Sequence, residues 1–202
     1  MRSLLRRILG SRGEIATFPL LSESGRLRLR PFTPGDHRTV ENWFKDLASC
    51  RLAFGVDADT EVIQEMAEEY LADLRSDAQG VLLIEDSSRG ASLGFLRYKL
   101  FRKDRQSLAR LGILLGLSEQ RGKGLGSEAM RTLLSYLFES RGVDLIELDT
   151  ASFNLGAQGC FRKCGFQTVR EMEIIGLYNR WAEKRLIMRL SAEQWRATRQ
   201  SS

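Results

Sequence analysis

The stretch SEQRGKGLGSEAM, residues 118–130, decides how this sequence folds, because it places three glycines within five positions between an apolar run and a helical pattern. The cations Arg121 and Lys123 stand among these glycines. After them, apolar residues recur at helical spacing, namely Met130, Leu133, Leu134, Leu137 and Phe138. We therefore predict a loop that brings free backbone groups and positive charge to the start of a helix.

Such a loop suits an anion, and phosphate above all. Glycine lets the backbone approach a ligand closely because no Cβ stands in the way. The first amides of a helix have no acceptor within the helix, and its dipole favours negative charge there. A tight turn with exposed basic residues is the alternative interpretation, although a single glycine would make that turn.

Two common phosphate-binding motifs do not match this loop. A P-loop, Gly-x-x-x-x-Gly-Lys-Ser/Thr, requires a glycine where this sequence has Leu117. The dinucleotide fingerprint Gly-x-Gly-x-x-Gly matches Gly122 and Gly124 but meets Ser127 at its third glycine. The polar segment SEQR also separates the preceding strand from the glycines, so we do not favour a Rossmann fold.

The pattern on either side of the loop predicts one α/β domain with a mixed sheet. Alternating or continuous apolar runs predict strands at 26–32, 81–85, 92–101, 108–117, 143–150 and 184–190. Helical spacing and start signals predict helices from TPGD (33–36) through Leu47, over 60–74, from 126 onward and over 154–164. The short connections between 81 and 117 predict an antiparallel meander.

Composition excludes several classes of function. The 202 residues carry a net charge of +5, without the aromatic-interleaved basic clusters or zinc-finger spacing of a nucleic-acid reader, so no specific nucleic acid is expected. The single histidine, His37, disfavours a hydrolase triad. Cys50, Cys160 and Cys164 form no disulfide framework, and no metal site is predicted because Cys160 and Cys164 lack a second ligand pair.

The domain is expected to span 25–191, between a basic N-terminal extension (1–24) and a C-terminal tail (192–202). Residues 1–9 form a short amphipathic basic pattern, which predicts a leader helix. Its apolar stretches are too short for a signal peptide or a membrane span, so we expect a cytoplasmic protein without stable membrane insertion. The oligomeric state, monomer or homodimer, is left open.

Two motifs in order make the sequence resemble the GNAT superfamily of acetyl-CoA-dependent N-acetyltransferases. Arg121, Gly124 and Gly126 fit the Gln/Arg-x-x-Gly-x-Gly/Ala motif of that family. The segment NLGAQGCFRKCGF (154–166) resembles its downstream Asn-x-x-Ala-x-x-x-Tyr-x-x-x-Gly-Phe. The opening LRLRPFTPGD (27–36) is similar to the branch that contains ribosomal-protein and aminoglycoside N-acetyltransferases.

The resemblance implies a GNAT-like fold, with a mixed, mostly antiparallel sheet flanked by helices and splayed at its central strands. It also implies acetyl-CoA as the acetyl donor and a set of residues that bind it. Backbone groups on strand 108–117 would pair with the pantetheine arm, and amides of 122–127 would hold the pyrophosphate. The implied cofactor-binding residues are Leu115, Leu117, Arg121, Gly122, Lys123, Gly124, Leu125, Gly126, Ser127, Asn154 and Phe161.

An attacking amine must lose a proton, and two carboxylates are candidates for the base. Glu147 and Asp149 lie two apart on strand 143–150 and therefore point to one face. Asp149, five residues before Asn154, resembles a carboxylate that serves catalysis or acceptor binding in the family. Solvated acids at the end of a strand are the alternative interpretation for both.

Phe161 stands where many family members have a tyrosine that protonates the departing thiolate, so the general acid is unassigned, with Cys160, Tyr136 or water as substitutes. A non-catalytic acyl-CoA sensor or interaction protein of the same fold is the alternative function. For the acceptor we expect an amine on a small molecule or a protein N-terminus. The acidic segment 57–77 would attract cationic acceptors, or it is merely the wet face of a helix.

Overall fold

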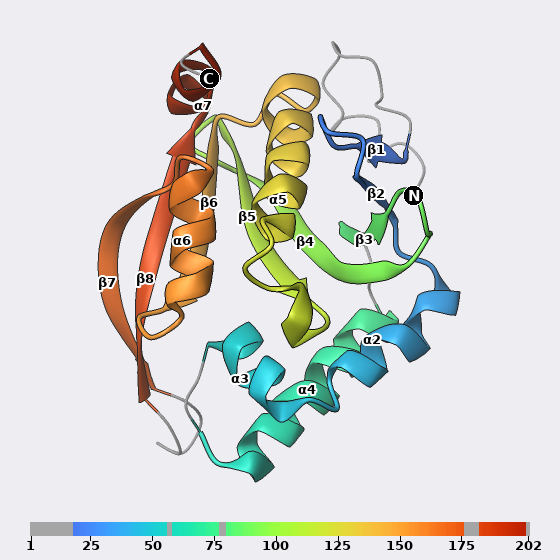
Figure 1. Ribbon diagram of the computed structural model, residues 1–202. Helices are drawn as coiled ribbons and strands as arrows, with labels where there is room; N and C mark the ends of the chain where they lie inside the picture. Colours follow the sequence, from blue (N-terminus) through green and yellow to red (C-terminus); the bar gives the residue numbers. More distant parts are fainter. Residues whose placement is uncertain (1–17, 56–57, 77–79, 176–181, 201–202) are drawn as a thin grey trace, which may run out of the picture.

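The computed structural model describes residues 18–55, 58–76, 80–175 and 182–200. Its strands form one sheet in the order β1-β2-β3-β4-β5-β6-β8-β7 (Figure 1). All neighbouring strands are antiparallel except β5 and β6, which confirms the mixed, mostly antiparallel sheet. The strands are β1 (Leu20–Leu21), β2 (Leu27–Pro31), β3 (Val81–Asp86), β4 (Ser92–Lys103), β5 (Gln106–Leu115), β6 (Leu145–Ala151), β7 (Gln167–Ile175) and β8 (Ala182–Ser191).

Helices cover both faces of this sheet. One layer consists of α5 (Leu125–Ser135) and α6 (Leu155–Lys163), which Figure 1 shows side by side in front of the strands. The other layer consists of α2 (His37–Trp43), α3 (Leu47–Phe54) and α4 (Thr60–Ser76). The remaining elements are the short helices η1 (Pro34–Asp36) and η2 (Ser118–Gln120), the π-helical turn η3 (Tyr136–Ser140) and the C-terminal α7 (Ala192–Gln200).

The alternation of side chains along β5 divides the interior into two apolar cores. Ala109 and Leu111 pack into the larger core beneath α5, whereas Leu114 packs into the smaller core beneath α2, α3 and α4. Neighbouring residues of a strand point to opposite faces. Each face of β5 therefore meets a different helical layer.

The two parallel strands at the centre of the sheet separate soon after they meet. β5 pairs with β6 only from Leu108↔Leu145 to Arg110↔Glu147. Beyond these pairs, β5 stays bonded to β4 and β6 stays bonded to β8, each to the end of its length. The central strands thus open a gap in the sheet, as the splayed fold requires.

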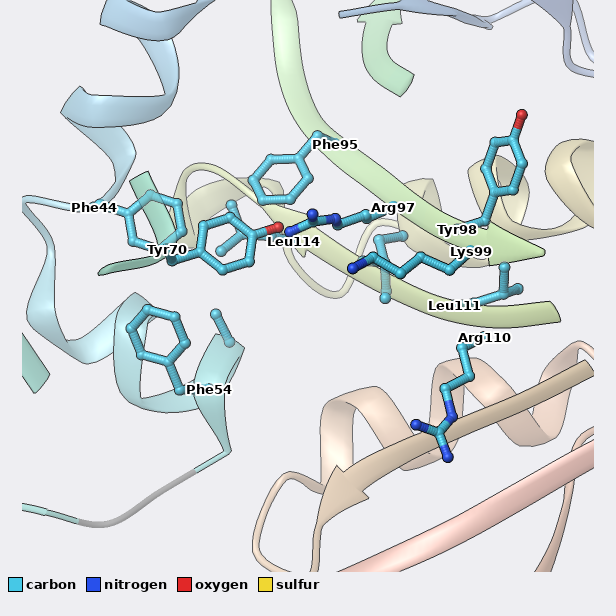
Figure 2. Close-up of a pocket in the computed structure, with 13 residues that line it drawn as sticks. Phe44, Phe54, Tyr70, Phe95, Arg97, Tyr98, Lys99, Arg110, Leu111 and Leu114 are labelled. Carbon is cyan, nitrogen blue, oxygen red and sulfur yellow. The ribbon is translucent and has the colours of Figure 1, made fainter. Parts of the chain in front are cut away.

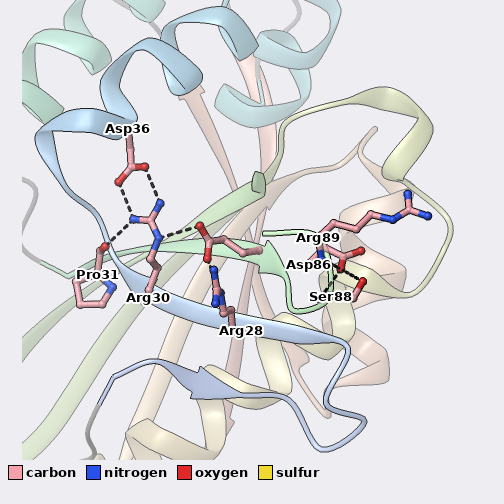
Figure 3. Close-up of polar contacts among 8 residues, drawn as sticks. Arg28, Arg30, Pro31, Asp36, Asp86, Ser88 and Arg89 are labelled. Carbon is pink, nitrogen blue, oxygen red and sulfur yellow. Dashed lines mark hydrogen bonds and ion pairs between the residues drawn. The ribbon is translucent and has the colours of Figure 1, made fainter. Parts of the chain in front are cut away.

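The buried carboxylate of Asp36 holds the segment that connects β2 to α2 (Figure 3). Arg30 on β2 donates to both oxygens of Asp36, each at 2.7 Å, and to Glu85 on β3 at 2.8 Å. Arg28 donates to the other oxygen of Glu85 at 2.6 Å. The hydrogen bonds from Arg30 are the main reason why the pKa of Asp36 falls from 3.8 to about 2.

The structure departs from the sequence analysis at four elements, the first of which is the unpredicted strand β1. The helix expected to run through Leu47 ends at Trp43, and Asp46 caps a separate helix, α3, by accepting from the amide of Ala48 at 3.1 Å. Strand β7 had no prediction. The expected tail 192–202 is helical over α7, where Trp195 is buried in the larger core.

The rest of the predicted elements lie where the patterns placed them, including the meander of β3, β4 and β5. The basic leader helix expected over 1–9 lies outside the described residues. Among the helices of the described ranges, none combines the length and the apolar character needed to cross a membrane.

Candidate active site

The glycine loop leaves its backbone facing open space. Gly122 and Gly124 have φ angles of +74° and +79°, a left-handed conformation that favours glycine, and Gly124 is the N-cap of α5. A Cβ added at either glycine would meet no heavy atom within 4 Å. The first turn of α5 is therefore accessible to a ligand from the side of the loop.

This loop forms one wall of a pocket of about 630 Å³, which we call the glycine-loop pocket. Helices α3 and α6 and the end of β5 form the other walls. Its cationic lining residues are Arg121 and Lys163. An anion at the helix start would thus meet backbone amides and two positive side chains together.

Two polar side chains connect the walls of the pocket to α3. Asn154 accepts from the amide of Ala157 at 3.0 Å, which caps α6, and its Nδ2 donates to the carbonyl of Leu52 at 3.1 Å. Arg121 donates to the hydroxyl of Ser49 at 2.6 Å. These bonds hold α3 against both the loop and α6, and so they set the width of the pocket.

Most of the residues predicted to bind the cofactor come together here. The pocket is lined by Leu115, Arg121, Gly122, Gly124, Leu125, Gly126, Ser127 and Asn154. Leu117 and Lys123 are not among its lining residues. Phe161 is only 4% exposed and packs edge-to-face on Phe166 in the larger core, with ring centroids 6.1 Å apart.

The rotation of α6 explains why Phe161 is absent from the pocket. Its neighbour Cys160 lines the pocket instead and accepts a hydrogen bond from the hydroxyl of Ser127 at 3.4 Å. A hydrogen bond from Cys164 is the main cause that lowers the pKa of Cys160 to about 7. This thiol can therefore give or take a proton near neutral pH.

A second pocket, of about 280 Å³, lies beneath the α2–α4 layer, and we call it the aromatic pocket (Figure 2). Its walls carry four aromatic side chains and three cationic ones. These residues are Phe44, Phe54, Tyr70, Phe95, Arg97, Lys99 and Arg110. Its lining shares Ala53, Ile113 and Leu114 with that of the glycine-loop pocket. The two pockets therefore meet where β5 leaves β6.

The two candidate carboxylates lie on β6, and neither lines either pocket. Glu147 is engaged from both sides, by Arg110 at 3.3 Å and by Arg189 at 2.9 Å. Asp149 lies two residues beyond the last β5–β6 pair, at the open part of the sheet. Its Oδ2 accepts from Arg185, and no donor from the described residues reaches its Oδ1.

Sequence reasoning missed the contribution of α3 to both pockets. Leu52 and Ala53 of α3 lie in the lining of the glycine-loop pocket, whereas the helix predicted from the sequence stops at Leu47 and leaves this segment without a prediction. The Asp46 cap before an apolar run was the available signal. The cationic residues of β4 carried no signal, because alternating cations on a strand are typical of any solvated face.

A mixed sheet opened between parallel strands, with a glycine loop over one face and a second pocket on the other, defines an N-acetyltransferase fold. The sequence model of the acetyltransferase (GNAT) domain matches residues 26–167. This chain belongs to the GNAT acetyltransferase family.

Individual relatives are more distant. Aminoglycoside N(6')-acetyltransferase type 1 of Klebsiella pneumoniae is 41% identical over 54 residues, which are 27% of this chain and only 27% of that protein. Spermidine N-acetyltransferase from Vibrio cholerae, solved with CoA and spermine, aligns with a TM-score of 0.64 and 20% identity over 84% of this chain and 98% of its own. Ribosomal-protein-S5-alanine acetyltransferase from Vibrio fischeri aligns with a TM-score of 0.63 and 16% identity over 84% and 95%. The two structures share the fold, and the three names describe three kinds of acceptor.

Proposed function

We propose that this protein transfers the acetyl group of acetyl-CoA to a primary amine, on a small molecule or a protein N-terminus, by direct attack of the amine on the thioester. The observation that carries the proposal is the meeting of the two pockets at Ala53, Ile113 and Leu114. A donor in one pocket and an acceptor in the other would face each other through the gap between β5 and β6. Holding two reactants in this way is itself a large part of catalysis.

The glycine-loop pocket fits the donor. Gly122 and Gly124 leave the space that a pyrophosphate would fill, and Arg121 and Lys163 supply positive charge beside it. The free backbone edge of β5 near Leu115 suits the amide groups of a pantetheine arm. Acetyl-CoA, once bound, supplies the acetyl thioester.

Asp149 is our candidate for the group that receives the proton of the amine. Arg185 holds its Oδ2, no donor among the described residues reaches its Oδ1, and the residue lies beyond the last pair of β5 with β6. Glu147 is less suitable because two arginines already engage it. Attack forms the C–N bond and breaks the C–S bond, and the proton passes to Asp149 directly or through water.

Cys160 is our candidate for the proton donor to the departing thiolate. Phe161 has no proton to donate, and Tyr136 is buried against Tyr98, away from the glycine-loop pocket. A Cβ built on Gly126 would lie 3.5 Å from Cys160 Sγ and 3.8 Å from Ile113, so the thiol lies close to β5. Its pKa of about 7 suits proton transfer at neutral pH.

Thermal unfolding and transfer assays test the proposal together. Acetyl-CoA should raise the melting temperature, whereas NADH and ATP at equal concentration should not, because a ligand of the folded state stabilises it. A panel of amines, followed by free-thiol release and mass spectrometry, should reveal an acetylated product. Tight binding without turnover would favour the non-catalytic sensor, and an equal shift with NADH would contradict the assignment of the pocket.

Asp149→Asn tests the base, and Glu147→Gln, tested alongside, covers the possibility that the other carboxylate of the pair has this role. The change should leave acetyl-CoA affinity near that of the wild type and lower kcat by about 10²–10⁴-fold, the range of positioned proton transfer. The deficit should shrink as the pH rises, because more of the amine then arrives deprotonated. A loss confined to the acceptor KM would make Asp149 a binding residue instead.

A further inference from the structure

The described residues that line the aromatic pocket carry positive charge, whereas attraction of cationic acceptors is only one of the two interpretations of the acidic segment 57–77. Arg97 and Lys99 of β4 and Arg110 of β5 line it, and no carboxylate from the described part of the chain does. From the described part of the acidic segment 57–77, only Tyr70 reaches the lining. Figure 2 shows Arg97 and Lys99 extending toward the aromatic rings from one strand.

Arg97 has hydrogen-bonding capacity that its partners among the described residues, Asp73 and Tyr70, do not exhaust. Its Nη1 pairs with Asp73 at 2.7 Å, and its guanidinium lies over the ring of Tyr70 at 5.6 Å. Its Nε and Nη2 are buried and have no hydrogen-bond partner among the described residues. Buried donors without acceptors are unfavourable, and a guanidinium fork matches the paired oxygens of an anion.

The other two cations are only weakly compensated. Lys99 forms no ion pair with any residue that the structure describes. Arg110 is 70% exposed, and its one carboxylate contact among the described residues is a long one, of 3.3 Å, with Glu147, which Arg189 also engages. A polycation entering this pocket would meet repulsion, whereas an anion would meet attraction.

The strand register places this charge at a defined distance from the reaction centre. Arg97 lies opposite Gly112, two residues along β5 from Leu114, where the two pockets meet. Two residues of a strand span about 7 Å. An acceptor with its amine at the meeting point would therefore carry its anion about 7 Å away, with an apolar body between the rings.

We infer that the acceptor is a primary amine that also carries an apolar or aromatic group and an anionic group, a carboxylate or a phosphate, rather than a polyamine or an aminoglycoside. The inference depends on the proposed function, because it names the occupant of the acceptor pocket. Arg97 and Lys99 are the residues that would determine this specificity.

Matched acceptors separate the charge from the rest of the ligand. Glycyl-phenylalanine carries a carboxylate, glycyl-phenylalaninamide lacks it, and glycyl-phosphotyrosinamide replaces it with a phosphate, while spermidine and kanamycin represent the polycations. Acetyl transfer to at least one anionic peptide should exceed that to the neutral amide by about 10- to 100-fold in kcat/KM, the factor of one charged hydrogen bond. The better of the two anionic peptides identifies the anion.

Arg97→Gln and Lys99→Gln should remove most of this preference, so that the ratio of kcat/KM between the anionic peptide and the neutral amide falls toward one. Lys103→Gln, on the same strand and face but outside the pocket, is the control and should change neither rate. Lys99 is exposed, so its variant tests the idea even if Arg97→Gln lowers the melting temperature.

Preference for spermidine or kanamycin, equal rates for acid and amide, or an unchanged preference in both variants would overturn the inference and leave the acetyltransferase assignment intact. Acetyl-CoA binding with no transfer to any of the five amines would also count against it and favour the sensor. Failure to bind acetyl-CoA would instead refute the proposed function itself.

Discussion

Replacing Arg185 by methionine should destabilise this protein far more than any exposed ion pair would lead one to expect. The side chain of Arg185 is 12% exposed and connects three elements of the fold. Its Nη1 donates to the carbonyls of Phe54 at 2.6 Å and Gly55 at 2.9 Å, at the end of α3, while its Nε and Nη2 bind Asp149 on β6.

The expected loss follows from these contacts. Hydrogen bonds from a charged donor contribute about 1.5–3 kcal/mol each, so the two carbonyl contacts account for about 3–6 kcal/mol. Asp149 is 45% exposed and regains water when its partner is removed, so we count its ion pair at no more than about 1 kcal/mol. Methionine recovers part of the loss through packing, which leaves about 3–5 kcal/mol.

Urea unfolding followed by tryptophan fluorescence and circular dichroism measures this change in the free energy of unfolding. In a chain of this size, it corresponds to a fall in Tm of about 6–20 °C. Arg189→Met is the matched control on the same strand, because Arg189 is 47% exposed and Glu147 is its one ion-pair partner among the described residues. This change should cost about 0–1 kcal/mol. A loss from Arg185→Met below about 1 kcal/mol, or equal to that of the control, would refute the reasoning.

Three further predictions concern other parts of the fold. Gly124→Val should abolish most acetyl-CoA binding, because a β-branched residue is strained at φ +79° and its side chain occupies the open side of the loop. Calorimetry measures the affinity, and a normal value would exclude this loop as the donor site. Asp36→Asn should cost about 2 kcal/mol at pH 7, because the pKa of Asp36 lies at about 2 in the folded protein against 3.8 ordinarily. That stabilisation is complete above pH 3.8 and is lost as the pH falls toward 2, so the difference between variant and wild type in denaturant titrations should narrow over that range. Iodoacetamide should alkylate Cys160 with a midpoint near pH 7, and bound acetyl-CoA should slow this reaction. Cys164 should react slowly, because its pKa is raised mainly by its hydrogen bond to Cys160. Mass spectrometry of the labelled peptides distinguishes the two thiols.

The elements around the glycine loop could be predicted because local chemistry determines them. The apolar spacing from Met130 to Phe138 favours a helix that packs one face against a sheet. The five apolar residues that define this spacing in the sequence are all buried. The glycines likewise indicate a backbone segment that turns sharply or approaches a ligand closely. Both signals are contained within a few residues and need no information from distant parts of the chain.

The features that were missed depend on tertiary packing. Whether Phe161 or Cys160 faces the pocket is decided by the rotation of α6 on the sheet, and the helical pattern alone allows either. The sequence pattern cannot distinguish Arg97 and Lys99 from ordinary solvated cations. Their place beside Tyr70 of α4 in one pocket depends on how α4 packs on the sheet. The gap between β5 and β6 came from the family resemblance, since no sequence pattern marks where two strands stop pairing.

The short seam between β5 and β6 has a consequence for how this protein unfolds. In the part of the chain that the structure describes, three residue pairs of the ladder connect the half-sheet β1–β5 to the half-sheet β6–β8–β7. The ladder itself therefore contributes little to cooperative unfolding of the two halves. The two halves are candidates for separate foldons, coupled by α3 through Arg185 and Asn154. Amide hydrogen exchange along β5 beyond Arg110 should then report sub-global opening, and a ligand lodged in the seam would act as a missing strand that makes the two halves unfold as one.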